Sequence, residues 1–325
     1  MRAITYHRYG PPEVLQLEDV PAPVPKDDEV LIRVRAAEAT KADCEMRAFR
    51  FAVKWFWLPL RLAVGITRPR NKILGGYFAG VVEAVGPQVT RLAVGDEVYG
   101  SAGLGFGAYG ELVTVRERAS VVKKPADMTF EEAAAVPLGG LNALHFLRLA
   151  AIRPGERVLI NGAGGSIGAH GVQIAKAMGA EVTAVDNEIK RALIERLGAD
   201  HFVDYTREDF WSRGETWDVV FDMIPHTPYA AILRVLNPGG RYLKGNPRFV
   251  DLLRAPWTTR TTDKRVSMAF AKESHAELDA LRTMIEAGEL SPIVDTVYPL
   301  EQAAEAHRRV ETEQRAGAIV LAIST

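Results

Sequence analysis

The hydrophobic pattern of the chain changes near residue 124. Before that point, short runs alternate apolar and polar residues, as in "EVLIRVRAA" and "AGVVEAVG", and turn signals such as "PPE", "VGD" and "GLGFGAYG" separate the runs. Such alternation is typical of strands that bury one face. We therefore predict a mainly β domain over residues 1–124.

A helical pattern follows in residues 131–151. Thr129 and Glu132 have the spacing of a capping box, which marks the start of a helix. Residues 137–140 contain one proline and two glycines. We expect them to interrupt the helix, because neither residue type favours a helix interior.

Strand and helix patterns alternate from Arg157 to about residue 265. The helical stretches end at Gly179 and Gly198, and the strand patterns are "RVLIN", "EVTAVD", "HFVDY", "WDVVFD" and "RYLKG". This alternation predicts an α/β domain over residues 125–265, a doubly wound parallel sheet with helices on both faces. Residues 266–325 carry an amphipathic helix and a final apolar strand, and we expect them to return to the first domain.

The glycine-rich turn "NGAGGSIG" joins the first of these strands to its helix. Its small residues have the spacing Ala163-x-Gly165-x-x-Gly168, and Asp186 ends the next strand. Small residues allow a backbone to approach a diphosphate, and the free N–H groups of a helix start face its oxygens. The turn therefore predicts dinucleotide binding by its six residues, which are Ala163, Gly164, Gly165, Ser166, Ile167 and Gly168.

Two further residues bear on which dinucleotide is bound. Asp186 is placed to accept hydrogen bonds from ribose hydroxyls and to repel a 2′-phosphate, which favours NAD(H). Lys190, one turn further on, is placed to pair with that phosphate, or else it is a solvated lysine on an exposed helix face. We expect NAD(H) and keep NADP(H) as the alternative.

Composition narrows the class of partner. Lys and Arg number 40 against 41 Asp and Glu, so the net charge of −1 gives no electrostatic reason to expect nucleic acid or an anionic membrane. The single cysteine, Cys44, excludes an internal disulfide and a zinc site built on several thiolates. The first residues lack the apolar core of a secretory signal, and charges interrupt the apolar stretch 51–66. We expect a soluble cytoplasmic protein that acts on a small hydrophobic molecule.

The chain resembles the medium-chain dehydrogenase/reductases, specifically their zinc-independent quinone oxidoreductase branch. The motifs that carry the resemblance are "YGPPEVLQLEDVP", "AGVVEAVGPQVTRLAVGDEVYG", "KPADMTFEEAAAVP", "VLINGAGGSIG", "LGADHFVDYTREDF", "LNPGGRYL" and "GELSPIVDTVYPLEQAAEAHRRVE". The resemblance implies a GroES-like catalytic domain split around a Rossmann domain, with the active site between them, and a homodimer joined through the Rossmann domain.

The resemblance also bears on zinc. Where zinc-dependent relatives carry a cysteine and a His-Glu pair, this chain has Thr40 and Gly76-Tyr77. Neither Thr40 nor Gly76 offers a usual zinc ligand, and Cys44 lies four residues beyond the expected position, so we read it as an ordinary buried thiol. No metal site is expected. Acceptors that are already electrophilic, namely quinones and α,β-unsaturated carbonyls, then fit hydride transfer from a nicotinamide.

Catalytic candidates follow from the same comparison. Thr40 and Asp43 match positions that line the family's cleft; the Thr40 hydroxyl could donate to a carbonyl oxygen, and Asp43 is either catalytic or a buried structural carboxylate. Tyr109 and Tyr77 are candidate proton donors, with core packing as their alternative.

The resemblance places three more residues near the cofactor. Asn142 falls near the nicotinamide and Tyr205 by the adenosine ribose, while Asn246 follows the fifth strand and is either a cofactor contact or part of a plain turn. The aromatic segment 51–57 predicts either an apolar wall for the substrate or a small core under a loop.

Two other functions stay open from the sequence. An enoyl-thioester reductase needs phosphate-binding cations, which only the cluster Arg68, Arg70 and Lys72 suggests, and a solvated charge run explains that cluster as well. A nucleotide-binding protein with little catalysis is the other, because a fold does not by itself imply turnover.

Overall fold

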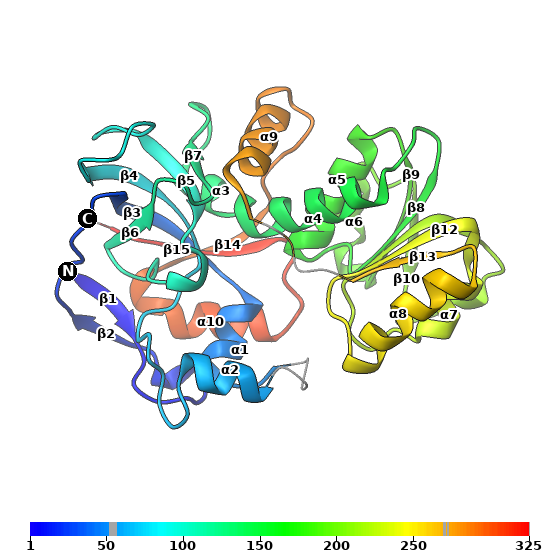
Figure 1. Cartoon of the computed structure of the whole chain (residues 1–325), viewed down its shortest axis with the longest axis horizontal. Coiled ribbons are helices and arrows are strands. Elements are labelled where there is room, and N and C mark those ends of the chain that lie inside the picture. The colour runs from blue at the N-terminus through cyan, green and yellow to red at the C-terminus, as the bar shows by residue number, and fades with distance from the viewer. Residues whose placement is uncertain (52–56, 269–270, 272, 325) are drawn as a thin grey trace.

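The computed structural model describes residues 1–51, 57–268, 271 and 273–324. Figure 1 shows two lobes side by side along the long axis, with both chain ends on the first lobe. The first lobe contains the strands before residue 124 and those after residue 293, and the second contains the strands between 157 and 267. Helices α3 (Phe130–Ala134), α4 (Val136–Ala150) and α9 (His275–Glu286) lie between the lobes.

The second lobe is built on a six-stranded sheet with the order β10-β9-β8-β11-β12-β13. Every neighbouring pair is parallel, as predicted, and this order is that of a Rossmann domain. The strands are β8 (Arg157–Asn161), β9 (Glu181–Asp186), β10 (His201–Asp204), β11 (Trp217–Asp222), β12 (Leu236–Lys244) and β13 (Arg265–Ser267).

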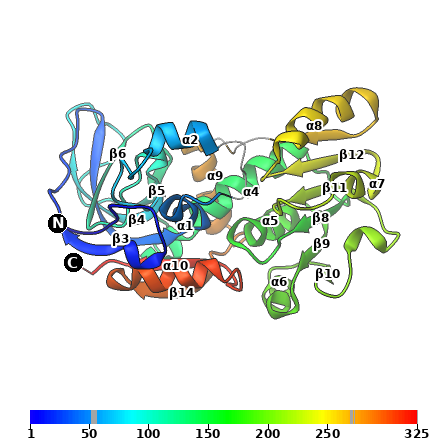
Figure 2. The ribbon, with the colours of Figure 1, turned by 90° about the horizontal axis from the view of Figure 1, so that it is seen from below.

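Helices cover both faces of this sheet (Figure 2). Val158 and Ile160 of β8 belong to one apolar cluster with α4 and α5, whereas Leu159 belongs to a second cluster with α7. Alternate residues of one strand therefore feed two cores, which is why the strand patterns are almost continuously apolar. The helices are α5 (Ser166–Ala177), α6 (Arg191–Arg196), α7 (Tyr229–Arg234) and α8 (Phe249–Thr261).

The first lobe is a mainly β, GroES-like domain. Its large sheet has the order β14-β15-β3-β4-β5-β7, with β6 also pairing with β3, and β1 and β2 form a separate hairpin. The strands are β1 (Arg2–Thr5), β2 (Gln16–Asp19), β3 (Glu29–Ala39), β4 (Tyr77–Val85), β5 (Glu97–Ser101), β6 (Leu112–Arg116), β7 (Val121–Lys123), β14 (Val294–Pro299) and β15 (Ala318–Ala322). Helices α1 (Lys41–Ala48), α2 (Trp57–Val64) and α10 (Ala303–Glu311) flank it.

The end of the chain returns to this first lobe. Strand β15 pairs antiparallel with β3, with Ile319 opposite Ala39. One apolar cluster then crosses between the lobes, because it contains Ala36 of β3 and Val320 of β15 together with Val172 of α5. We call the region of this cluster where the two lobes meet the seam.

The predicted interruption of the first long helix is misplaced. The break lies at Ala135, and α4 runs unbroken through residues 137–140. Pro137 is tolerated because it occupies the first turn of α4, where its missing N–H group has no intrahelical partner to lose. Gly139 allows α4 and α5 to approach, since a Cβ atom there would lie 2.3 Å from His170 Nδ1.

A buried polar network joins the carboxyl ends of β8, β11 and β12. Asp222 is fully buried and accepts hydrogen bonds from Asn161 (2.9 Å), Thr227 (3.0 Å) and Tyr242 (2.8 Å). The buried Lys244 ammonium lies 3.3 Å from the same carboxylate. Because Asn161 directly precedes the glycine-rich turn, the network fixes the sheet edge from which that turn departs.

Removing the Asp222 carboxylate tests how much this network contributes to the stability of the fold. We expect Asp222→Ala to lower the free energy of unfolding by about 3–5 kcal/mol, because Lys244 is left charged and buried without its partner. Glu195→Ala, which removes an exposed ion pair with Arg191, is the control and costs about 0–1 kcal/mol. Urea unfolding of both variants measures the difference, and equal losses would contradict the assignment.

Candidate functional site

The glycine-rich turn lies at the carboxyl edge of the second sheet, between β8 and α5. The amides of Gly162 and Ala163 both donate to the Val185 carbonyl, at 3.0 and 3.1 Å, which ties the turn to β9. Gly162 has φ +88°, a conformation that favours glycine. The first backbone bond into the helix is donated by Ala169 to Gly165 (2.8 Å), so the three preceding amides are those of a free helix N-terminus. Such amides form an anion-binding site.

The glycines of the turn are required for different reasons. A Cβ atom on Gly168 would lie 2.1 Å from the Gly162 carbonyl oxygen, so only glycine lets α5 pack this closely. A Cβ atom on Gly165 would meet only that same oxygen, at 3.7 Å, an ordinary contact. Gly165 is therefore dispensable for packing, and the space beside it is open to a ligand.

Asp186 and Lys190 form a buried pair next to the turn. Asp186 Oδ2 accepts from the Gly164 amide (2.7 Å), Oδ1 accepts from the Asn187 amide (2.9 Å), and Lys190 Nζ lies 3.1 Å from Oδ1. Lys190 is only 7% exposed, so its reading as a solvated surface lysine is wrong. The lysine stem covers Gly164, where a Cβ atom would lie 2.4 Å from Lys190 Cδ.

The other three cofactor candidates lie on separate elements. Asn142, on α4, donates from its side chain to the Leu138 carbonyl (2.8 Å), and Asn246, after β12, donates to the Met223 carbonyl (2.8 Å). Tyr205 follows β10 and is 56% exposed. The side-chain amides of Asn142 and Asn246 thus hold the local backbone, whereas the exposed Tyr205 ring is available to contact a ligand.

Thr40, Asp43 and Tyr109 come together at the start of α1. Thr40 caps the helix in a reciprocal capping box: its hydroxyl accepts from the Asp43 amide (3.0 Å) and donates to Asp43 Oδ2 (2.6 Å). Asp43 also accepts from the Gly75 amide (3.0 Å), and the Tyr109 hydroxyl is near enough to favour its ionised form. Burial raises the pKa of the Asp43 carboxyl, and these hydrogen bonds oppose the rise.

The cluster continues away from Asp43 to His307 and Arg47. Tyr109 Oη lies 3.1 Å from His307 Nε2, and His307 Nδ1 lies 3.0 Å from the Arg47 guanidinium. Burial, then the Arg47 charge, lowers the pKa of His307 to about 3, so the ring is neutral. Since a guanidinium only donates, Nδ1 is the acceptor and Nε2 carries the hydrogen that it donates to Tyr109. The Tyr109 hydroxyl therefore accepts from His307, and its own hydrogen is available to interact with Asp43.

A second polar link joins residues far apart in the sequence. The Glu273 carboxylate accepts from Tyr77 (2.7 Å) and from Ser101 (2.5 Å). Burial, then the Glu273 charge, raises the pKa of Tyr77 well above its usual range, which keeps the phenol protonated. Glu273 is not among the residues predicted from the sequence, since a lone glutamate carries no spacing signal.

Some sequence-level candidates lie elsewhere. Cys44 is buried, as expected, and its thiol contacts the His307 carbonyl. Arg68, Arg70 and Lys72 are exposed, in keeping with a solvated charge run. Residues 52–56 of the aromatic segment lie outside the described residues.

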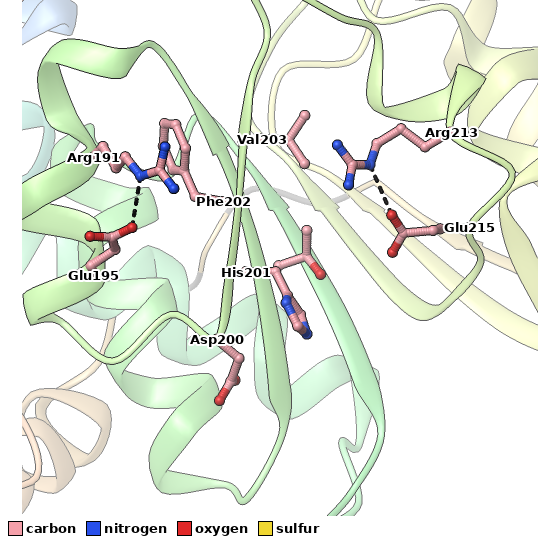
Figure 3. Close-up of a pocket in the computed structure, with 9 residues that line it drawn as sticks. Arg191, Glu195, Asp200, His201, Phe202, Val203, Arg213 and Glu215 are labelled. Carbon is pink, nitrogen blue, oxygen red and sulfur yellow. Dashed lines mark hydrogen bonds and ion pairs between the residues drawn. The ribbon is translucent and has the colours of Figure 1, made fainter.

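A surface cavity of about 270 Å³ lies beside the edge strand β10, away from these residues (Figure 3). Arg191 pairs with Glu195 and Arg213 pairs with Glu215, each at 2.8 Å, so the two arginines are already neutralised. The cavity is lined by Thr183, Arg191, Glu195, Asp200, His201, Phe202, Val203, Arg213 and Glu215. None of the predicted site residues is among them, and we do not regard it as the site.

The described residues contain neither a group of metal ligands nor a membrane-spanning helix. Within residues 1–51, 57–268, 271 and 273–324, no three His, Cys, Asp or Glu side chains are grouped as metal ligands would be. In the same part of the chain, every helix is too short or too polar to cross a membrane.

The different roles of the two glycines lead to a stability prediction. We expect Gly168→Ala to lower the free energy of unfolding by about 1–3 kcal/mol, because its methyl group must push the helix from the strand. Gly165→Ala, in the same turn, costs less than about 1 kcal/mol, the ordinary cost of alanine at an N-cap. Thermal or urea unfolding compares them, and a larger loss for Gly165→Ala would refute the packing role of Gly168.

Comparisons with known proteins give the same architecture. Residues 26–126 match the family described as an alcohol dehydrogenase GroES-like domain, and residues 197–321 match the family described as a zinc-binding dehydrogenase. The chain is 32% identical over 323 residues to a quinone oxidoreductase of Sus scrofa, covering 95% of this chain and 94% of that protein. It is 31% identical over 334 residues to the 2-methylene-furan-3-one reductase of Solanum lycopersicum, covering 99% and 79%.

A solved structure extends the likeness to three dimensions. The quinone oxidoreductase of Coxiella burnetii superposes with a TM-score of 0.88 at 27% identity, over 100% of this chain and 99% of that one. Both lobes and their connection are therefore those of the related enzyme.

Proposed function

Because the chain belongs to the medium-chain dehydrogenase/reductase superfamily, among the relatives of quinone oxidoreductases and enone reductases, we propose that it is a zinc-independent, NAD(P)H-dependent reductase. Its substrates are quinones or α,β-unsaturated carbonyl compounds. The observation that carries the proposal is the turn before α5, where free helix amides, an open space beside Gly165 and the Asp186 carboxylate lie together.

These residues fit a nicotinamide dinucleotide. The first amides of α5 would bind the diphosphate, because they are free donors at the positive end of a helix. Asp186 would face the adenosine ribose, since it ends the second strand of the sheet. The bound dinucleotide supplies the hydride, and the protein supplies its orientation.

The zinc-free part of the proposal rests on side-chain chemistry. Thr40 and Gly76 stand where zinc-dependent relatives carry ligands, and neither is a usual ligand. A conjugated acceptor needs less polarisation than a simple ketone, because its β-carbon is already electrophilic. The reductase of Solanum lycopersicum, named for such an enone, supports this substrate class.

On the acceptor side, we assign Thr40 to the carbonyl oxygen of the substrate and Asp43 and Tyr109 to the positioning of Thr40. The Thr40 hydroxyl must turn its proton from Asp43 to the substrate. The Asp43 carboxylate keeps its bonds from the Thr40 amide and from the Gly75 amide when this happens. The start of α1 therefore keeps its conformation while the Thr40 hydroxyl reorients.

Turnover tests the proposed reaction directly. We expect oxidation of NADH, followed at 340 nm in buffer with chelator, when a quinone or an enone is added. Gly165→Val should bind no dinucleotide yet stay folded, because its branched side chain fills the space that the diphosphate requires. Gly165→Ala is the matched control for folding. Binding without turnover on a quinone, an enone, an enal or an enoyl-coenzyme A would instead favour a nucleotide-binding protein.

We propose that Asp186 sets the preference between NAD(H) and NADP(H), and that NAD(H) is preferred. We expect Asp186→Asn to raise the NADPH:NADH ratio of kcat/KM about tenfold, as removal of about 1.4 kcal/mol of repulsion would. The amide oxygen of asparagine can still accept from Gly164, which keeps that one tie between the turn and β9. Lys190→Ala should lower the rate with NADPH selectively if its ammonium pairs with the 2′-phosphate. An unchanged ratio in Asp186→Asn would show that this residue does not read the ribose.

A further inference from the structure

Helix α8 presents large apolar side chains to the solvent. Leu253 and Trp257 are 65% and 72% exposed, and they lie one turn apart on the same side of the helix. Phe249 and Val250, in the first turn, are exposed as well. The residues that the helix buries are instead Asp251, Ala255 and Thr258. A surface helix of a soluble domain normally has the reverse arrangement, so the outer face of α8 is better suited to an apolar partner than to water.

Polar contacts hold α8 to the second lobe in this orientation. Asp251 accepts from the Arg248 amide (3.2 Å) and from the Arg248 guanidinium (2.9 Å). The Thr258 hydroxyl accepts from the Tyr229 hydroxyl (2.9 Å). Turning the helix to bury its apolar side would break these bonds and leave buried polar groups without partners. The apolar face therefore stays on the outside.

Positive charges flank the apolar face. Arg254 and Arg260 of α8 are exposed, and neither makes a hydrogen bond or an ion pair within the part of the chain that the structure describes. Residues 252–272 contain five Lys and Arg and one acidic residue, Asp263, which accepts from the Gly239 amide (2.9 Å). Large apolar side chains beside unpaired arginines are typical of helices that lie in the surface of an anionic membrane.

Helix α2 has a similar character and lies along the same edge of the molecule, the lower edge in Figure 1 and the upper edge in Figure 2. Leu62 in α2 and Ile66 just after it are exposed. The surrounding residues 46–82 contain no Asp or Glu. They contain seven Lys and Arg, namely Arg47, Arg50, Lys54, Arg61, Arg68, Arg70 and Lys72. The overall net charge of −1, on which the expectation of no membrane partner rests, hides this local excess of positive charge.

We propose that the outer face of α8, with α2 as a second contact, rests on the surface of an anionic phospholipid bilayer. The apolar side chains would enter the boundary between headgroups and acyl chains, and the arginines would meet the negative charges of the headgroups. A helix that lies in the plane of the surface needs no membrane-spanning segment. The inference concerns binding alone and does not depend on the proposed reaction.

A second copy of the chain fits this face less well. A two-fold contact uses the same surface on both copies, so it would bring the unpaired arginines of the two faces together. Like charges that meet across an interface oppose association. An anionic bilayer instead offers charges of the opposite sign over a wide area.

Sedimentation with vesicles tests the proposal. We expect the full chain to sediment with phosphatidylcholine vesicles that contain about one third phosphatidylserine, and to stay in the supernatant with vesicles of phosphatidylcholine alone. Raising NaCl from about 0.05 M to about 0.5 M should weaken the binding, because salt screens the attraction. No binding to the anionic vesicles at low salt, or equal binding to both kinds of vesicle, would overturn the proposal.

Paired variants locate the contact. Leu253→Ala should weaken binding to the anionic vesicles about tenfold, as the loss of a buried leucine side chain would. Its control is Leu149→Ala, an exposed leucine of α4 on the opposite face of the sheet. Arg254→Ala should weaken binding about fivefold, and Arg118→Ala, an exposed arginine between β6 and β7, is its control. All four side chains are exposed, so we expect every variant to fold. Equal effects of the α8 variants and their controls would overturn the proposal.

Sedimentation velocity without lipid tests the competing occupant, a second copy of the chain. We expect the wild type and Leu253→Ala to have the same oligomeric state and to differ only in their binding to vesicles. A wild-type dimer that Leu253→Ala dissociates, together with no binding of the wild type to anionic vesicles, would assign the face to a second copy and overturn the proposal.

Discussion

The close approach of Gly168 to the Gly162 carbonyl is the contact on which the rest of the site depends. It brings the first turn of α5 against the end of β8, and this sets the direction in which the free amides point. The amide bonds to Val185 and to Asp186 then hold the turn against β9. A helix N-terminus is an anion site only when its amides are held away from other partners, and this packing holds them so.

Networks of buried polar groups also hold the backbone in place in both lobes. The Asp222 network holds the carboxyl edge of the second sheet, and the cluster around Asp43 holds the start of α1 in the first lobe. In both networks the buried carboxylate is surrounded by donors, which offsets the cost of removing it from water. Glu38 differs, because its Oε2 atom has no hydrogen-bond partner among the described residues and burial raises the pKa of its carboxyl group to about 8.

The sequence predicted those features whose signal is local. The parallel sheet, the glycine turn and Asp186 follow from periodicity and spacing, and the capping box at Thr129 is confirmed. Helix α8 has no comparable signal, because it exposes Leu253 and Trp257 while burying Asp251, Ala255 and Thr258. Its apolar positions therefore do not mark its inner face.

Contacts between residues far apart in the sequence could not be predicted either. The burial of Lys190 depends on Gly164, whose missing side chain leaves room for the lysine stem. Gly139 of α4 closely approaches His170 of α5, and Ile319 of β15 pairs with Ala39 of β3. These are contacts between segments far apart in the chain, and a single sequence carries no pattern for them.

The central claim is that the turn before α5 holds a nicotinamide dinucleotide whose hydride passes to a conjugated acceptor. Mass spectrometry of an enone reduced in the presence of NADH deuterated at nicotinamide C4 tests it most directly. The account predicts a saturated ketone that carries deuterium at its former β-carbon. Unreacted enone, or a product reduced without deuterium from either C4 position, would contradict it.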